Sequence, residues 1–292
     1  MSLDYIAAQL FNGLASGAYY ALLALGLSII FGTLRVINFA HGAMYMLGAF
    51  GAYYGAQLLG LGFFPALIVV PIAVGLVAML FEWLVFRRLA GSDPIYGLLF
   101  TFAMTLVIVN VMEILAGTLG SPYQMPDVLS GATNLGFTEY PTYKLFVIGI
   151  SFVVCLLVWF FVERSIIGAR VRAATEHPVL TRALGVNTPR LVTVTFGIGV
   201  AIAALAGVLA APTSNVLPTM GDDIVIYTFA IVVIGGLGSI AGSIVAGFLL
   251  GVLQAVGAVY YPPIATTLIF IVMVIIIWLR PSGLFGRPEL TR

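Results

Sequence analysis

Residues 145–162 read LFVIGISFVVCLLVWFFV, and the next ten residues, 163–172, read ERSIIGARVR. The first stretch contains no charged residue and is apolar on every side of a helix, which lipid tolerates and water does not. Its length is close to the roughly 20 helical residues that cross a bilayer core of about 30 Å. The second stretch gathers charge at the end of the run. The pair therefore predicts a transmembrane helix that ends on the cytoplasmic side, where Arg collects beside membrane spans.

The whole chain repeats this pattern of apolar runs and short basic interruptions. Hydrophobic residues make up 62% of it and charged residues 8%, whereas a soluble domain carries roughly 25% charged residues. Most arginines gather at Arg87–Arg88, in residues 164–190 and in residues 280–292. The runs are long and do not alternate, which favours helices over a barrel. We therefore predict an all-α, polytopic transmembrane helix bundle.

Six apolar runs come first, followed by a less regular apolar region. The expected spans are 6–31, 39–59, 64–86, 95–116, 145–162 and 191–211. Gly235–Ser239 and Tyr261–Pro263 divide the last region, 224–279, into three pieces. These pieces are short for full spans, so a broken or re-entrant pair stays open as an alternative. We expect about eight to nine spans and one membrane domain, residues 1–292, without a separate soluble domain.

The distribution of charge also predicts which side of the membrane each loop faces. If the amino terminus lies outside and the carboxyl terminus inside, every arginine falls on the inner side. The two loops that carry acidic residues, 117–144 and 213–223, then lie outside. Only Lys144 violates the rule. This agreement is the strongest support for the predicted topology.

The residue types that enzymes use do not form recognisable motifs. Cys155 is the single cysteine, and His41 and His177 stand in different loops without a second ligand at metal spacing. The single lysine, Lys144, follows Tyr143, so no Gly-Lys-Ser/Thr phosphate loop exists. We therefore expect no catalytic residue, no cofactor, no metal and no enzymatic activity, and no nucleic-acid partner. If ATP drives transport, another chain must bind it.

Polar side chains are sparse inside the expected spans. Asn12, Asn110 and Gln254 are candidates for lining a translocation pathway, because a solute with charged ends needs hydrogen-bonding groups there. Glu82 lies near Arg87–Arg88, and we expect it to pair with them at the inner membrane interface.

Glycines recur at a spacing of four residues. These pairs are Gly13/Gly17, Gly51/Gly55, Gly238/Gly242 and Gly247/Gly251. Small residues at this spacing let helices approach closely in lipid. They predict close helix packing, with a moving seam between helices or subunits as the alternative.

Residues 163–190 form the largest loop predicted on the inner side. The sequence predicts a short helix through Ala174, a break at residues 176–178, a second short helix over 179–184, and a stop at Gly185. Such a helix pair either lies on anionic lipid as an interfacial element or forms a docking platform for a soluble partner. Physical reasoning alone leaves both interpretations open.

Several segments of the chain resemble the branched-chain amino acid permease family of ABC importers, in particular its LivH-type subunit. The segments are GARVRA (168–173), RALGVN (182–187), ALAGVL (204–209), IFGTLRVINFAHG (30–42), GGLGSIAG (235–242) and RPSGLFG (280–286). They span nearly the whole chain in the family's order. The resemblance implies a bacterial inner-membrane permease of the type II importer kind.

The resemblance also implies partners and a coupling element. The partners would be a second, LivM-like permease subunit, two cytoplasmic ABC ATPases and a periplasmic solute-binding protein, with lipid around them. The cytoplasmic coupling loop would be 163–190. Its candidate coupling residues are Arg170, Arg172, Glu176, His177, Arg182, Ala183 and Gly185.

The solute and the mode of transport remain the open part of this interpretation. Branched-chain amino acids are the expected solutes, and urea, short amides or aromatic acids are the alternatives within the family. A self-sufficient secondary carrier or channel is the rival from another class. Carriers of that class use broken-helix ion sites, and the glycine-rich break at 235–242 is the one feature that offers such a site.

Overall fold

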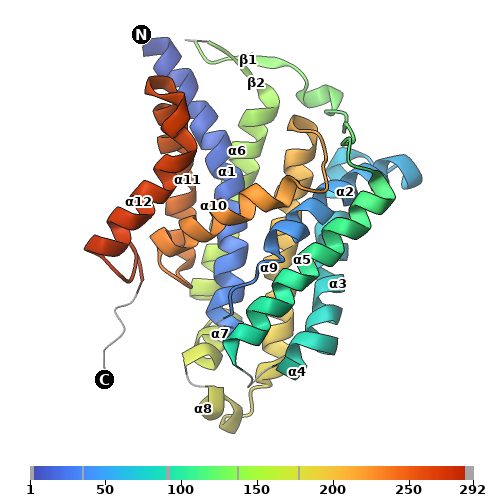
Figure 1. Cartoon of the computed structure of the whole chain (residues 1–292), viewed down its shortest axis with the longest axis vertical. Coiled ribbons are helices and arrows are strands. Elements are labelled where there is room, and N and C mark those ends of the chain that lie inside the picture. Colours follow the sequence, from blue (N-terminus) through green and yellow to red (C-terminus); the bar gives the residue numbers. More distant parts are fainter. Residues whose placement is uncertain (1–2, 35, 90–92, 137, 177, 287–292) are drawn as a thin grey trace. The chain divides into compact units, whose positions relative to one another are not determined.

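The computed structural model describes residues 3–34, 36–89, 93–136, 138–176 and 178–286. Most of these residues are helical (Figure 1). The helices are α1 (Leu3–Leu34), α2 (His41–Leu59), α3 (Phe63–Phe81), α4 (Arg87–Leu89), α5 (Pro94–Ala116), α6 (Thr142–Arg164), α7 (Ile166–Glu176), α8 (Pro178–Ala183), α9 (Thr188–Ala210), α10 (Met220–Gly235), α11 (Ile240–Tyr260) and α12 (Ala265–Leu279).

Short elements complete the described chain. A π-helical turn, η1 (Glu82–Phe86), joins α3 to α4, and 3-10 turns cover Asp127–Leu129, Ala211–Thr213 and Pro262–Ile264. The strands β1 (Ala132–Asn134) and β2 (Glu139–Pro141) form an antiparallel hairpin in which Thr133 pairs with Tyr140. The prediction of an all-helical membrane protein is confirmed, and this hairpin is its small exception.

The predicted spans correspond to helices, but not all of these helices have the length and composition of a span. In the described part of the chain, seven are long and apolar enough to cross a membrane. They cover Asp4–Leu34, Phe63–Leu89, Ile95–Ala116, Thr142–Arg164, Thr188–Thr213, Ile240–Tyr260 and Pro262–Leu279. The other two helices at predicted spans are α2, which is rich in glycine and polar residues, and α10, which has only 16 residues.

The chain divides into two compact units. The first unit comprises Met1–Leu25, Gln124–Leu157 and Ile226–Arg292, and the second comprises Gly26–Tyr123 and Val158–Val225. Three of the four boundaries fall inside α1, α6 and α10, so these three helices each contribute to both units, and the fourth falls in the loop after α5.

In the first unit, α1 packs directly against α11 through glycines. A Cβ atom added to Gly251 would collide with the Cα atom of Gly17, and one added to Gly13 would lie 2.5 Å from the Cα atom of Val252. Gly247 meets Ala21 in the same way. Two glycine pairs predicted separately, one on each helix, are therefore the two sides of a single contact.

The carboxyl-terminal segment of the first unit caps the carboxyl end of α10 by hydrogen bonds. The Leu284 N–H donates a 2.8 Å hydrogen bond to the Ile234 carbonyl, and the Phe285 N–H donates a 3.0 Å bond to the Gly235 carbonyl. Gly236, at φ +104°, and Gly283, at φ +77°, touch backbone to backbone. The segments 235–242 and 280–286, far apart in sequence, thus form one structure that satisfies carbonyls that a helix end leaves unpaired.

The second unit has a buried core in which α2, α3 and α9 lie against one another. Gly48 of α2 approaches the backbone of Ala204 in α9, and Gly75 of α3 approaches that of Gly197 in the same helix. Over the same part of α2, a hydrophobic cluster joins this helix to α5 and to the segment after α9. Its buried members are Ala43, Met46, Ala49, Phe50, Met112, Ala211 and Val216.

Candidate functional site

The segment 163–190 folds into a helical hairpin at the ends of α6 and α9. Helix α7 ends at Glu176 and α8 begins at Pro178, which is close to the predicted break. Figure 1 shows both short helices beside the start of α9. His177 lies outside the described residues, as does the side chain of Glu176.

Gly185 ends α8 in a left-handed conformation with φ +83°. The Gly185 N–H donates to the Arg182 carbonyl at 2.9 Å, and the Val186 N–H donates to the Thr181 carbonyl at 3.2 Å. These two bonds make a Schellman motif, the common way to end a helix with glycine. The helix stop predicted at Gly185 therefore has a defined geometry.

Two of the predicted coupling arginines brace the hairpin from inside. Arg172 of α7 donates to the carbonyls of Val162 and Glu163 and forms an ion pair with the Glu163 carboxylate at 3.6 Å. Arg182 of α8 donates from Nε to Thr188 Oγ1 at 2.7 Å, at the first residue of α9. These side chains hold α7 to the end of α6 and α8 to the start of α9.

A buried threonine, which the sequence analysis did not single out, joins the two short helices. Thr181 donates from Oγ1 to the Ala173 carbonyl at 2.9 Å and is 4% exposed. Neither Thr181 nor Thr188 belongs to a recognisable motif, since their partners stand eight and six residues away in the chain. Only the folded hairpin reveals them.

The outer face of the hairpin is apolar with basic residues beside it. Val179, Leu180 and Leu184 are 80%, 60% and 77% exposed. Ala183 and Arg170 are exposed as well. We call Arg170, Val179, Leu180, Ala183 and Leu184 the hairpin surface. Exposed apolar side chains gathered on one small element are typical of an interaction site.

The structure places the three candidate pathway residues in different surroundings. Asn12 accepts hydrogen bonds at Oδ1 from Lys144 Nζ at 2.9 Å and from the Tyr140 hydroxyl at 3.1 Å. Gln254 accepts a 2.8 Å bond from the Tyr20 hydroxyl. Asn110 belongs to the second unit, is exposed on α5 and donates to the Leu106 carbonyl of its own helix. Asn12 and Gln254 both lie in the first unit and have side-chain partners there.

Glu82 is buried at the π-helical turn, and a third residue is hydrogen-bonded to both its carboxylate and Arg87. The Thr193 hydroxyl of α9 donates to Glu82 Oε2 and accepts a 3.0 Å hydrogen bond from Arg87 Nη2. The expected pairing of Glu82 with the nearby arginines thus runs through Thr193.

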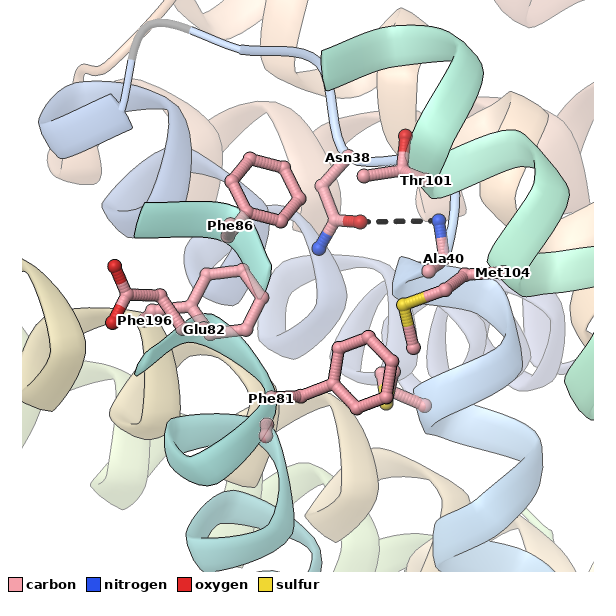
Figure 2. Close-up of a pocket in the computed structure, with 10 residues that line it drawn as sticks. Asn38, Ala40, Phe81, Glu82, Phe86, Thr101, Met104 and Phe196 are labelled. Atoms are coloured by element: carbon pink, nitrogen blue, oxygen red, sulfur yellow. Dashed lines mark hydrogen bonds between the residues drawn. The ribbon is translucent and has the colours of Figure 1, made fainter. Parts of the chain in front are cut away.

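Beside this turn lies a small pocket, shown in Figure 2, with room for about one water molecule. It is lined by Asn38, Ala40, Met44, Ala78, Phe81, Glu82, Phe86, Thr101, Met104 and Phe196. The lining is mostly apolar, and Asn38, which is 2% exposed, contributes a side-chain amide to it.

Comparisons with known proteins identify the class of protein to which this chain belongs. A family model described as "Branched-chain amino acid transport system / permease component" matches residues 9–279. The chain therefore belongs to this permease family.

Individual relatives match along nearly the whole chain. It is 30% identical to the branched-chain amino acid permease BraD of Pseudomonas aeruginosa, with 97% of each chain covered. It is 29% identical to LivH of Escherichia coli, with 99% of this chain and 98% of the relative covered. LivM of Escherichia coli is 26% identical and covers 93% of this chain, which spans 69% of LivM.

Proposed function

We propose that the chain is the LivH-type subunit of an ABC importer for branched-chain amino acids. Its partners are a LivM-like permease, two cytoplasmic ATPases and a periplasmic solute-binding protein. The relatives of both LivH and LivM type support a pair of similar permease subunits. In this assignment the amino terminus faces the periplasm and the hairpin surface faces the cytoplasm, as the arginine distribution predicts.

The observation that carries the coupling role is the braced hairpin with its exposed apolar surface. Arg172 and Arg182 hold the two short helices to α6 and α9, so a force on the hairpin reaches these two helices directly. Val179, Leu180 and Leu184 lie open to a partner. Because a basic interfacial pair could instead bind anionic lipid, the experiment has to separate protein docking from lipid attraction.

The matched variants Ala183→Glu and Ala183→Lys make this separation. Both add bulk to the hairpin surface, but they add opposite charges. Docking to an ATPase predicts that both variants lose ATPase recruitment to membranes and lose uptake. Lipid attraction predicts opposite effects, with the Lys variant equal to or better than the wild type. Normal recruitment and uptake in both variants would refute the coupling role.

The solute is tested with the complete importer in proteoliposomes. We expect uptake of leucine, isoleucine and valine that needs ATP, the binding protein and the second permease. If the importer took up urea, a short amide or an aromatic acid and none of these three amino acids, that compound would be its solute. Uptake by this chain alone without ATP would favour the carrier or channel.

A further inference from the structure

Asn38 has a buried hydrogen-bond donor without an acceptor among the described residues. The residue is 2% exposed, and its Oδ1 accepts a 3.1 Å hydrogen bond from the Ala40 N–H. That bond fixes the orientation of the amide, because only the oxygen can accept. The nitrogen Nδ2 then points into the pocket between Phe81 and Phe86 (Figure 2). An unpaired buried donor is costly, so it calls for an explanation.

Glu82 lines the same pocket but directs its carboxylate elsewhere. Figure 2 shows the two carboxylate oxygens pointing away from Asn38. One of them accepts from Thr193, and the Glu82 residue itself is 3% exposed. The residue best suited to accept from Asn38 therefore stands at the edge of the pocket and is bonded to α9.

The backbone at Glu82 departs from regular α-helical geometry. Glu82–Phe86 forms a π-helical turn in which the Arg87 N–H reaches back to the Glu82 carbonyl. Such turns occur often at functional sites. Since residues in an α-helix are about 100° apart, a shift of one residue in register turns the side chains by about that angle. Arg87 Nε is a second buried donor without an acceptor among the described residues.

Helix α9 connects this turn to the hairpin. Thr188, its first residue, accepts from Arg182 of α8, and Thr193 is bonded to Glu82 and Arg87. These contacts all lie within the second unit. A displacement of α8 therefore acts on the same helix that holds the Glu82 carboxylate.

We propose that Glu82 switches its hydrogen bond from Thr193 to Asn38 Nδ2 during the transport cycle, as α9 responds to the hairpin. Glu82 is thus a positioning residue for coupling, a role that rests on the proposed function. In the structure Glu82 is bonded to Thr193, which leaves Asn38 Nδ2 without an acceptor among the described residues. In the other position the carboxylate satisfies Asn38, and the pocket supplies the space for its oxygen.

The position in which Glu82 is bonded to Asn38 can be tested by exchanging the donor and the acceptor of that hydrogen bond. Asn38→Asp keeps an oxygen for the Ala40 N–H but removes the donor that Glu82 needs. We expect receptor-dependent uptake by the complete importer to fall about tenfold, as the loss of a hydrogen bond to a charged group allows. In the double variant Asn38→Asp/Glu82→Gln, the introduced amide donates to the introduced carboxylate, and the amide oxygen still accepts from Thr193. Uptake should return to the level of Glu82→Gln alone.

These variants can overturn the switch. Wild-type uptake in Asn38→Asp would show that the donor has no role. A double variant as inactive as Asn38→Asp would show that Asn38 only supports the fold, because a structural defect has no reason to be repaired by the exchange.

A second measurement does not depend on transport. Thr193→Val removes the hydroxyl that holds Glu82, whereas Thr193→Ser keeps it. In the full chain in lipid nanodiscs, we expect the amides of residues 82–86 to exchange hydrogen about tenfold faster in the Val variant than in the Ser variant. Equal exchange in the two would overturn the switch. If the wild-type importer took up no branched-chain amino acid while this difference was present, the proposed solute would fail and the switch would stand.

Discussion

Lys144 shows how a single residue can depart from the charge pattern of a membrane protein. The predicted topology makes it the one basic residue on the side that the arginines leave free. Its ammonium donates to Asn12 and lies 5.7 Å from the centre of the Tyr140 ring, a distance at which a cation is attracted to the π system. These contacts stabilise the charge and fasten β2 to α1 within the first unit.

Tyr140 supplies a pH-dependent prediction for this cluster. Burial, with a smaller contribution from Tyr19, raises the pKa of Tyr140 from 10.0 to about 12. Because the neutral form is favoured in the folded state, the stability from this residue is complete below pH 10 and is lost as pH rises towards 12. Alkaline titration of tyrosinate absorbance, taken as wild type minus Tyr140→Phe, should give this raised pKa. A difference curve centred near 10, the ordinary value, would contradict the prediction.

Gly185 gives a second prediction at the scale of one residue. Its left-handed backbone has open space around it, so the obstacle to another residue is conformation and not a clash. Gly185→Val should strain the Schellman motif by about 1 kcal/mol or more and lower uptake. Gly185→Asn, which tolerates this conformation, is the matched control and should retain most activity. Equal uptake by the two variants would show that the helix stop does not matter for coupling.

The helices themselves are the part of the fold that the sequence predicts well. Apolar runs set the lengths of the helices. Pro178 and Gly185 act through their own backbone, so the break and the stop in the helical hairpin α7–α8 can be predicted from the local sequence. Strands β1 and β2 have three residues each, which is too few to show an alternating pattern. The π-helical turn could not be predicted, because a distant contact, that of Thr193 with Glu82, accompanies it. For the same reason the sequence identified Arg172 and Arg182 as candidates but not their roles as braces.

The brace between α8 and α9 yields a prediction at the scale of the elements. Arg182→Met and Thr188→Val should each remove the 2.7 Å hydrogen bond and lower uptake. The double variant should be little worse than either single variant, because the partners share one interaction. Arg88→Met is the comparison, since Arg88 is exposed on α4, outside the helical hairpin. Additive losses in a double-variant cycle of uptake rates would contradict the brace.

The contact between α1 and α11 belongs to the scale of the whole molecule, because it joins helices from opposite ends of the chain. Gly251→Ala places a methyl group against the Gly17 Cα, too close for either backbone to remain in place. We expect a loss of about 1–3 kcal/mol, as overpacking typically costs, and a lower melting temperature in detergent. Gly149→Ala in α6 is the control, since nothing lies within 4 Å of its added Cβ. If both variants melted at the same temperature, the close contact would not exist in solution.

The predicted topology is tested over the length of the molecule by labelling two loops from each side of the membrane. Ser130 lies in the loop before β1 and Glu176 lies at the end of α7, and the arginine distribution assigns them to opposite sides. Cys155, buried in α6, is the single cysteine of the sequence. A Cys155→Ala background therefore has no native thiol. In that background a membrane-impermeant maleimide should label Ser130→Cys in intact cells, and Glu176→Cys only after the inner face is opened. Labelling of both positions from one side would reject the topology, and with it the assignment of the hairpin surface to the cytoplasm.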